Sequence, residues 1–166
     1  MDTLIRVQEA DFDLQTEYDR LRVDNPGAIV TFTGLVRDFN RDHVAGSASV
    51  DTLTLQHYPG MTEKLLAEIV DEARERWSVI GVTVLHRVGT LAPGDQIVLV
   101  AVSAAHRQEA FEATSFLMDY LKTRATFWKK VNAGGEESWV DMHQADRAAA
   151  SRWEASEAGG DDGADI

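Results

Sequence analysis

Two apolar runs separated by one short turn constrain this fold more than any other feature. Residues 81–91 (GVTVLHRVGTL) and 96–104 (QIVLVAVSA) are rich in the β-branched residues that favour strands. The turn between them, Ala-Pro-Gly-Asp at 92–95, has proline at its second position and glycine at its third, as a type II turn requires. The sequence therefore predicts an antiparallel hairpin over residues 81–104.

The rest of the chain mixes strand and helix signals. The expected elements are strands at 28–36 and 50–57, helices at 62–77, 106–122 and 144–153, and a short hairpin of 125–131 and 137–141 around a Gly-Gly turn. The polar stretch 37–49 is expected to be a loop. This order favours one α+β domain over residues 1–153. The acidic tail, 154–166, is expected to be disordered.

Charge and hydropathy exclude two classes of partner. The formal net charge of −12 is unsuited to binding nucleic acid, since phosphate contacts need many Lys and Arg residues. No apolar run approaches the ~20 residues that span a bilayer, so no membrane partner is expected. The N-terminal sequence lacks the basic segment and apolar core of a secretion signal, and a cytoplasmic location is expected.

The absence of cysteine limits the available chemistry. It removes disulfides, thiolate metal sites and a cysteine nucleophile. The five histidines show no short metal-ligand spacing, so we expect neither a metal nor another cofactor. If this protein handles sulfur, another molecule has to bring it.

Positive charge is concentrated at residues 118–130 (MDYLKTRATFWKK), which hold three of the four lysines in the chain. Their interleaving with Phe127 and Trp128 favours an anion pocket, and a solvated charged face is an alternative of about equal weight. Lys122 closes a predicted helix, where the helix dipole alone would favour a cation. Lys129 and Lys130 follow in an extended segment, so they are expected to point to opposite faces.

Three further basic residues are candidates for binding an anion. His106 and Arg107 stand at the predicted start of a helix, where free backbone N–H groups bind anions; a loop residue and a salt-bridge partner are the alternative roles. Arg37 ends the strand 28–36 and offers a bidentate phosphate contact, or equally an ion pair with Asp38.

Five segments resemble the family of large, catalytic subunits of molybdopterin synthase. They occur in order within residues 25–153: TFTGLVRDFN, LTLQHYPGMTEK, HRVGTLAPGDQIV, SAAHRQEAFEA and MDYLKTRATFWKK. The resemblance implies an α/β hammerhead-type fold with a small antiparallel β subdomain. It also implies a homodimer that binds two copies of a small ubiquitin-like sulfur-carrier subunit, giving a 2:2 heterotetramer.

The same resemblance implies a reaction and residue roles. The carrier's C-terminal glycine thiocarboxylate would supply sulfur, in two rounds, to cyclic pyranopterin monophosphate, forming the dithiolene of molybdopterin. Lys122 matches the principal catalytic lysine of the family, and Lys129 matches its second functional lysine, expected to orient the pterin or its phosphate. Arg37, His106 and Arg107 match positions expected to bind the substrate phosphate.

This chain departs from the family at two positions near the expected site. Thr126 stands where members commonly have proline, a change expected to loosen the turn. His143 stands where some members have an arginine that reaches the neighbouring subunit's pocket, and it is kept as a substrate-binding candidate. Two other functions stay open: a non-catalytic module that docks the carrier, and a small anion-binding domain, which lacks a Gly-rich phosphate loop.

Overall fold

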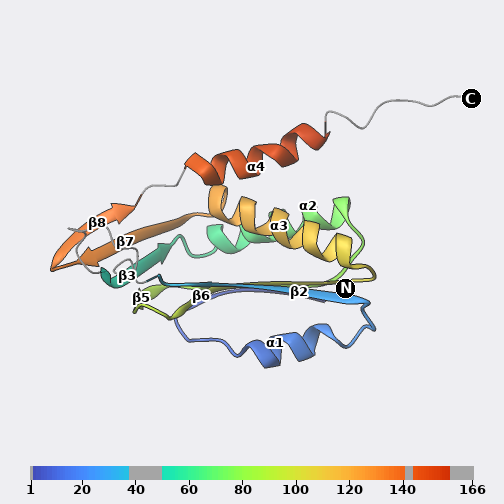
Figure 1. The fold of residues 1–166 in the computed structure, drawn as a ribbon, viewed down its shortest axis with the longest axis horizontal. Coiled ribbons are helices and arrows are strands. Elements are labelled where there is room, and N and C mark those ends of the chain that lie inside the picture. Colours follow the sequence, from blue (N-terminus) through green and yellow to red (C-terminus); the bar gives the residue numbers. More distant parts are fainter. Residues whose placement is uncertain (1, 38–49, 141–143, 158–166) are drawn as a thin grey trace, which may run out of the picture.

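The computed structural model describes residues 2–37, 50–140 and 144–157 (Figure 1). In chain order its elements are β1 (Asp2–Gln8), α1 (Leu14–Leu21), β2 (Ala28–Leu35), β3 (Val50–His57), α2 (Met61–Arg76), β4 (Val79–Arg87), β5 (Gly89–Leu91), β6 (Gln96–Ala104), α3 (Arg107–Thr123), β7 (Phe127–Ala133), β8 (Glu136–Val140) and α4 (Gln144–Glu157). The predicted α+β class is confirmed. The loop expected at 37–49 falls, apart from Arg37, outside the described residues. The tail was expected to be disordered from residue 154, but residues 154–157 belong to α4; residues 158–166 lie outside the described residues.

The first sheet has the strand order β1-β4-β6-β2 and lies between two layers of helix (Figure 1). Helices α2 and α3 cover one face, and α1 covers the other. Strand β1 runs parallel to β4, whereas β4, β6 and β2 pair antiparallel. Because both faces of the central strands are covered, β6 can be almost wholly apolar, and it is buried from Val98 to Ala104.

The largest core lies between this sheet and the two helices α2 and α3. Its fully buried side chains include Leu66, Ile69, Val82, Val84, Val100 and Phe116. Helix α4 lies on α3 and adds Trp153, whose ring packs edge-on against Phe116 at a centroid distance of 5.6 Å. Among the described residues, no helix is both long enough and apolar enough to cross a membrane.

A second, antiparallel sheet with the order β5-β3-β7-β8 extends from one end of the first (Figure 1). Its inner face contributes Leu53, Leu55 and Leu91 to a small core that also contains Val36, just after β2. The expected short hairpin is confirmed as β7 and β8, joined by two glycines with positive φ angles of 61° and 86°. This sheet is the predicted small antiparallel β subdomain.

The predicted hairpin over 81–104 is partly confirmed. Strands β4 and β6 pair antiparallel, and the turn forms as expected: Gly94 has φ 89° and the Asp95 N–H donates to the Ala92 carbonyl at 3.0 Å. However, the expected strand 81–91 is divided in two, because the chain leaves the first sheet after Arg87 and pairs with β3 in the second. Gly89, with φ 87°, supplies the backbone conformation for this change of sheet.

The first two elements, β1 and α1, were not predicted from the sequence. A signal for α1 is present, because the Asp13 side chain caps the helix by accepting from the Thr16 N–H at 2.7 Å. Strand β1 alternates only weakly between exposed and half-buried positions, and it forms by pairing with β4, about 80 residues later.

Candidate active site

Lys122 lies in the last turn of α3, as the sequence predicted. The neighbouring Leu117 and Leu121 are buried against the core, which holds this end of the helix on the sheet. The Lys122 side chain is about half exposed, and its ammonium lies 3.3 Å from a carboxylate oxygen of Asp146 in the first turn of α4. The last two helices therefore meet at this lysine.

Lys129 and Lys130 point to opposite faces of the second sheet, as strand alternation predicted. Lys130 forms an ion pair with Glu137 and lies 5.8 Å from the centre of the Trp139 ring, so it belongs to the outer face. Lys129 pairs in register with Leu55, whose side chain is buried on the inner face. This arrangement leaves Lys129 on the side of the sheet that faces the helices.

The environment of Lys129 lowers the pKa of its ammonium group. Partial burial is the main cause that lowers the pKa of Lys129, and the positive charge of Lys122 lowers it further. The Asp146 carboxylate acts in the opposite direction. Because the charges of Lys122 and Asp146 both act on Lys129, the two lysines and this one acid form a single electrostatic group. Lys129 itself is an exposed residue, so only part of its side chain is shielded from water.

The segment between the two lysines is anchored at three points. The Arg124 guanidinium forms two hydrogen bonds to Glu72 of α2, at 2.8 and 2.7 Å. The Thr126 hydroxyl lies 2.8 Å from the hydroxyl of Thr62 in α2. Phe127 stacks on a histidine of β4. The expectation that Thr126 loosens this turn omitted its hydroxyl, which makes a contact that proline cannot make.

That histidine, His86, is a residue of the site that the sequence analysis missed. It is 4% exposed, and its ring stacks on Phe127 with centroids 3.7 Å apart. Its Nδ1 lies 2.8 Å from the Arg87 carbonyl, which can only accept, so Nδ1 carries the proton. Burial above all, and then the positive charges of Lys129 and His57, lower the pKa of His86 to about 4. The ring is therefore neutral at physiological pH.

A second histidine, His57 in β3, lies on the same inner face. It pairs in register with Phe127, which places it diagonally across from Lys129. Its Nε2 is 3.6 Å from Glu63 of α2, and the same carboxylate accepts from the Gly60 N–H at 2.7 Å. From the sequence, His57 and His86 were considered only as metal ligands, whereas strand alternation could have placed His86 with the core-facing Val84.

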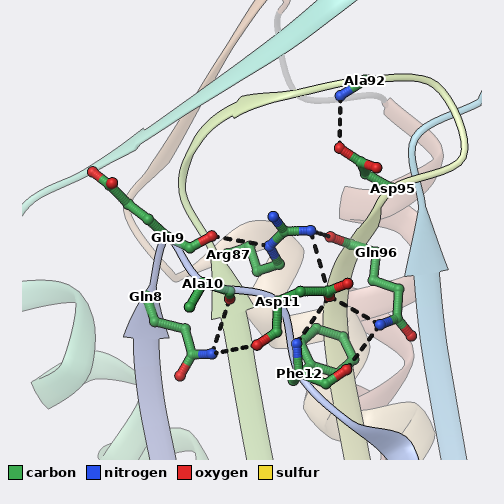
Figure 2. Close-up of polar contacts among 9 residues, drawn as sticks. All are labelled: Gln8, Glu9, Ala10, Asp11, Phe12, Arg87, Ala92, Asp95 and Gln96. Carbon is green, nitrogen blue, oxygen red and sulfur yellow. Dashed lines mark hydrogen bonds and ion pairs between the residues drawn. The ribbon is translucent and has the colours of Figure 1, made fainter.

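A polar network fixes the corner where the chain passes between the two sheets. Figure 2 shows the Arg87 guanidinium between the carbonyl groups of Glu9 and Gln96, to which it donates at 3.1 and 3.0 Å. The same guanidinium lies 3.4 Å from Asp11, which also accepts from the Gln96 amide at 2.9 Å. The N-terminal loop thereby holds the corner from which β5 leads into the sheet that carries Lys129.

The remaining predicted site residues are not gathered around Lys122 within one chain. His106 caps α3 and Arg107 begins it, and both are exposed at the end opposite Lys122. From His106 to Lys122 the helix rises about 24 Å, which is far beyond the reach of any side chain. Arg37 is exposed where β2 ends, at the edge of the first sheet nearest the second. His143 lies outside the described residues.

Within the described part of the chain, no group of three or more His, Asp or Glu side chains lies close enough together to hold a metal ion. The described site offers charged and titratable groups: two ammonium groups, one acid and two imidazoles at the junction of α3, α4 and the second sheet. Such a site can stabilise an anion and move a proton.

Comparison with known proteins gives a consistent result. The family model described as MoaE protein matches residues 7–124. The molybdopterin synthase catalytic subunit of Escherichia coli (strain K12) is 54% identical over 153 residues, which cover 92% of this chain and 99% of that protein. The catalytic subunit from Yersinia pestis is also 54% identical, over 91% of this chain and 97% of its own length.

Solved structures agree. The molybdopterin cofactor biosynthesis protein E from Burkholderia multivorans superposes with a TM-score of 0.76 at 49% identity, covering 93% of this chain and 98% of that one. The fold and the sequence thus lead to the same assignment: this chain belongs to the MoaE protein family.

Proposed function

We propose that this chain is the catalytic subunit of a molybdopterin synthase. It transfers sulfur from the C-terminal thiocarboxylate of a small ubiquitin-like carrier to cyclic pyranopterin monophosphate and so forms the dithiolene of molybdopterin. The observation that carries the proposal is the electrostatic group of Lys122, Lys129 and Asp146, in a chain 54% identical to a molybdopterin synthase catalytic subunit over nearly its whole length.

The two lysines suit the charges of this reaction. The thiocarboxylate and the substrate phosphate are anions, and cleavage of an acyl–sulfur intermediate by water develops an oxyanion before a carboxylate is released. Lys122 stabilises that charge as an ammonium at the end of α3. Lys129, whose pKa is lowered, more readily gives up a proton and is suited to proton transfer and to orienting the pterin.

Binding of the substrate phosphate is assigned to Arg37, His106, Arg107, Lys129 and His143. Since α3 separates His106 and Arg107 from Lys122 by about 24 Å, these two residues reach a Lys122 site only when a second copy of the chain supplies them. This separation supports a homodimer within a 2:2 assembly with the carrier, in which each pocket takes residues from both copies. The reaction is assigned to the cytoplasm.

The function is tested with purified components. The chain is mixed with thiocarboxylated carrier and cyclic pyranopterin monophosphate, and the dithiolene product is quantified by mass spectrometry, while binding of the carrier is measured separately. Product formation that depends on the chain supports the enzyme. Tight carrier binding without any product refutes it and leaves a docking module.

A further inference from the structure

The hydroxyl groups of Thr62 and Thr126 form a contact between helix α2 and the segment that joins Lys122 to Lys129. The two oxygens are 2.8 Å apart, and Thr62 is completely buried at the start of α2. Thr126 is the last residue before β7 and stands between Lys122 and Lys129 in the chain.

The hydrogen bonds around Thr62 leave a defined place for Thr126. The Thr62 oxygen accepts from the Tyr58 N–H at 3.2 Å, and its own hydrogen can be donated to the Tyr58 carbonyl at 3.0 Å. A hydroxyl oxygen has two acceptor sites, so one remains, and the Thr126 hydroxyl can donate to it. In this arrangement both hydroxyls are hydrogen-bonded. The Thr126 carbonyl, 3.3 Å from the Thr62 hydroxyl oxygen, is a second acceptor for the Thr62 hydrogen and is retained in any Thr126 variant.

Each end of this hydrogen bond is connected to one of the two lysines, on one side by packing and on the other by the chain. Helix α2 packs against α3, whose last turn carries Lys122, through a shared core that includes Leu66 and Leu117. On the other side, Thr126 leads directly into β7, where Lys129 is the third residue. The bond between the hydroxyls therefore fixes the start of β7 against helix α2, at a residue that lies between the two lysines in the chain.

We propose that Thr126 is a positioning residue: its hydroxyl, held by the buried Thr62, sets the distance between Lys122 and Lys129 in the active site. This inference rests on the proposed function for the meaning of the two lysines. The bond itself, and its effect on Lys129, can be measured without any substrate.

The test compares variants that differ by one hydroxyl group. Thr126→Val removes the hydroxyl at nearly constant volume, and Thr126→Ser retains it. Thr123→Val is the matched control, because the Thr123 hydroxyl donates to the Asp119 carbonyl within α3 at 2.9 Å and joins no second element. If Thr126→Val fails to fold, the pair Thr126→Ala and Thr126→Ser makes the same comparison.

Two readouts are taken below the melting temperature of every variant. The pKa of Lys129 is measured by NMR titration of labelled lysine, and the rate of dithiolene formation is measured in a single turnover beside carrier affinity. In Thr126→Val we expect the pKa of Lys129 to rise towards its ordinary value, since burial and the nearby Lys122 charge now lower it. We expect the rate to fall roughly 10-fold, part of the loss that a misplacement of ~1 Å produces, at unchanged carrier affinity.

Thr126→Ser and Thr123→Val are expected to match the unaltered chain in both readouts. The inference is overturned if Thr126→Val leaves the pKa of Lys129 unchanged, whatever its rate. A purely structural role for Thr126 would lower stability without moving that pKa selectively. Failure of the proposed function looks different: the unaltered chain forms no product, and the Lys129 titration still decides the role of Thr126.

Discussion

The Lys122 ammonium lies 3.3 Å from the Asp146 carboxylate and so joins the last turn of α3 to the first turn of α4. The family model ends at residue 124, so the acid that contacts the predicted catalytic lysine lies beyond the segment by which the family is recognised. Helix α4 is thus part of the candidate active site as well as a cover for the core.

Replacement of Asp146 by Asn is expected to lower the pKa of Lys129 further, because the negative charge that raises it is lost while the Lys122 charge remains. NMR titration can follow this change, since the chain has only four lysines. Asp119→Asn is the control: it breaks another contact between α3 and α4, the 2.8 Å ion pair with Arg152. A Lys129 pKa that stays constant or rises in Asp146→Asn would show that the two groups are not coupled.

Burial of neutral His86 predicts a loss of stability in acid. Its pKa is about 4 in the folded chain and 6.5 for the ordinary side chain, so between these values the unfolded chain binds a proton that the folded chain does not. Stability is therefore fully present above pH 6.5 and is lost as the pH falls to about 4, by on the order of 3 kcal/mol.

His86→Phe removes this titration and retains an aromatic ring against Phe127. Urea unfolding at pH 7 and pH 4.5 should show a smaller loss for the variant than for the unaltered chain. Because all carboxylates titrate in both proteins, the difference isolates His86. An equal loss in both would mean that His86 is not held neutral by the fold.

The opposite orientations of the two neighbouring lysines predict unequal effects on activity. Lys130 forms an ion pair with Glu137 on the outer face of the sheet. Lys130→Ala should therefore leave the rate of product formation within about twofold of normal. Lys129→Ala removes a charge from the site and should cost on the order of 100-fold. Single-turnover rates of the two variants decide the matter, and a greater loss in Lys130→Ala would contradict the assigned faces of β7.

The positive φ angle of Gly94, in the turn before β6, predicts that substitutions at this position lower the free energy of unfolding by different amounts. Its φ of 89° is a conformation that alanine adopts only at a cost of roughly 1 kcal/mol or more, and an added Cβ would meet no neighbouring atom. Gly94→Ala should therefore lower the free energy of unfolding by about this amount, and Gly94→Asn by less, since asparagine enters this region more readily. Urea unfolding that finds alanine as stable as glycine would argue against the type II turn.

The sequence predicted most elements because their patterns are local. The helix ending at Lys122 followed from apolar spacing, and the turn at Gly94 followed from residue type. The division of the strand at Val88 could not be predicted, because it depends on the pairing of β5 with β3, more than 30 residues away. Strand β1 was missed for the same reason, since its partner β4 is distant.

The sequence proposes candidate site residues but says little about how they are arranged. The lysines were found from their concentration in one segment and from the family resemblance. By contrast, Asp146 and Thr62 belong to helices that are distant in sequence from the segment of the two lysines. Only the packing of those helices brings Asp146 to Lys122 and Thr62 to Thr126. The length of α3 also separates His106 from Lys122, which a motif read in one dimension does not reveal.

The central claim, that Lys122 acts in the chemical step, is tested by a single turnover with thiocarboxylated carrier and cyclic pyranopterin monophosphate. Lys122→Ala is compared with Lys64→Ala, which removes an exposed lysine of α2 that pairs only loosely with Glu68 at 3.9 Å. We expect Lys122→Ala to lose product formation by on the order of 100-fold or more while it binds the carrier nearly as well, and Lys64→Ala to behave like the unaltered chain. Product at the normal rate from Lys122→Ala, or an equal loss of carrier binding and product, would contradict the account.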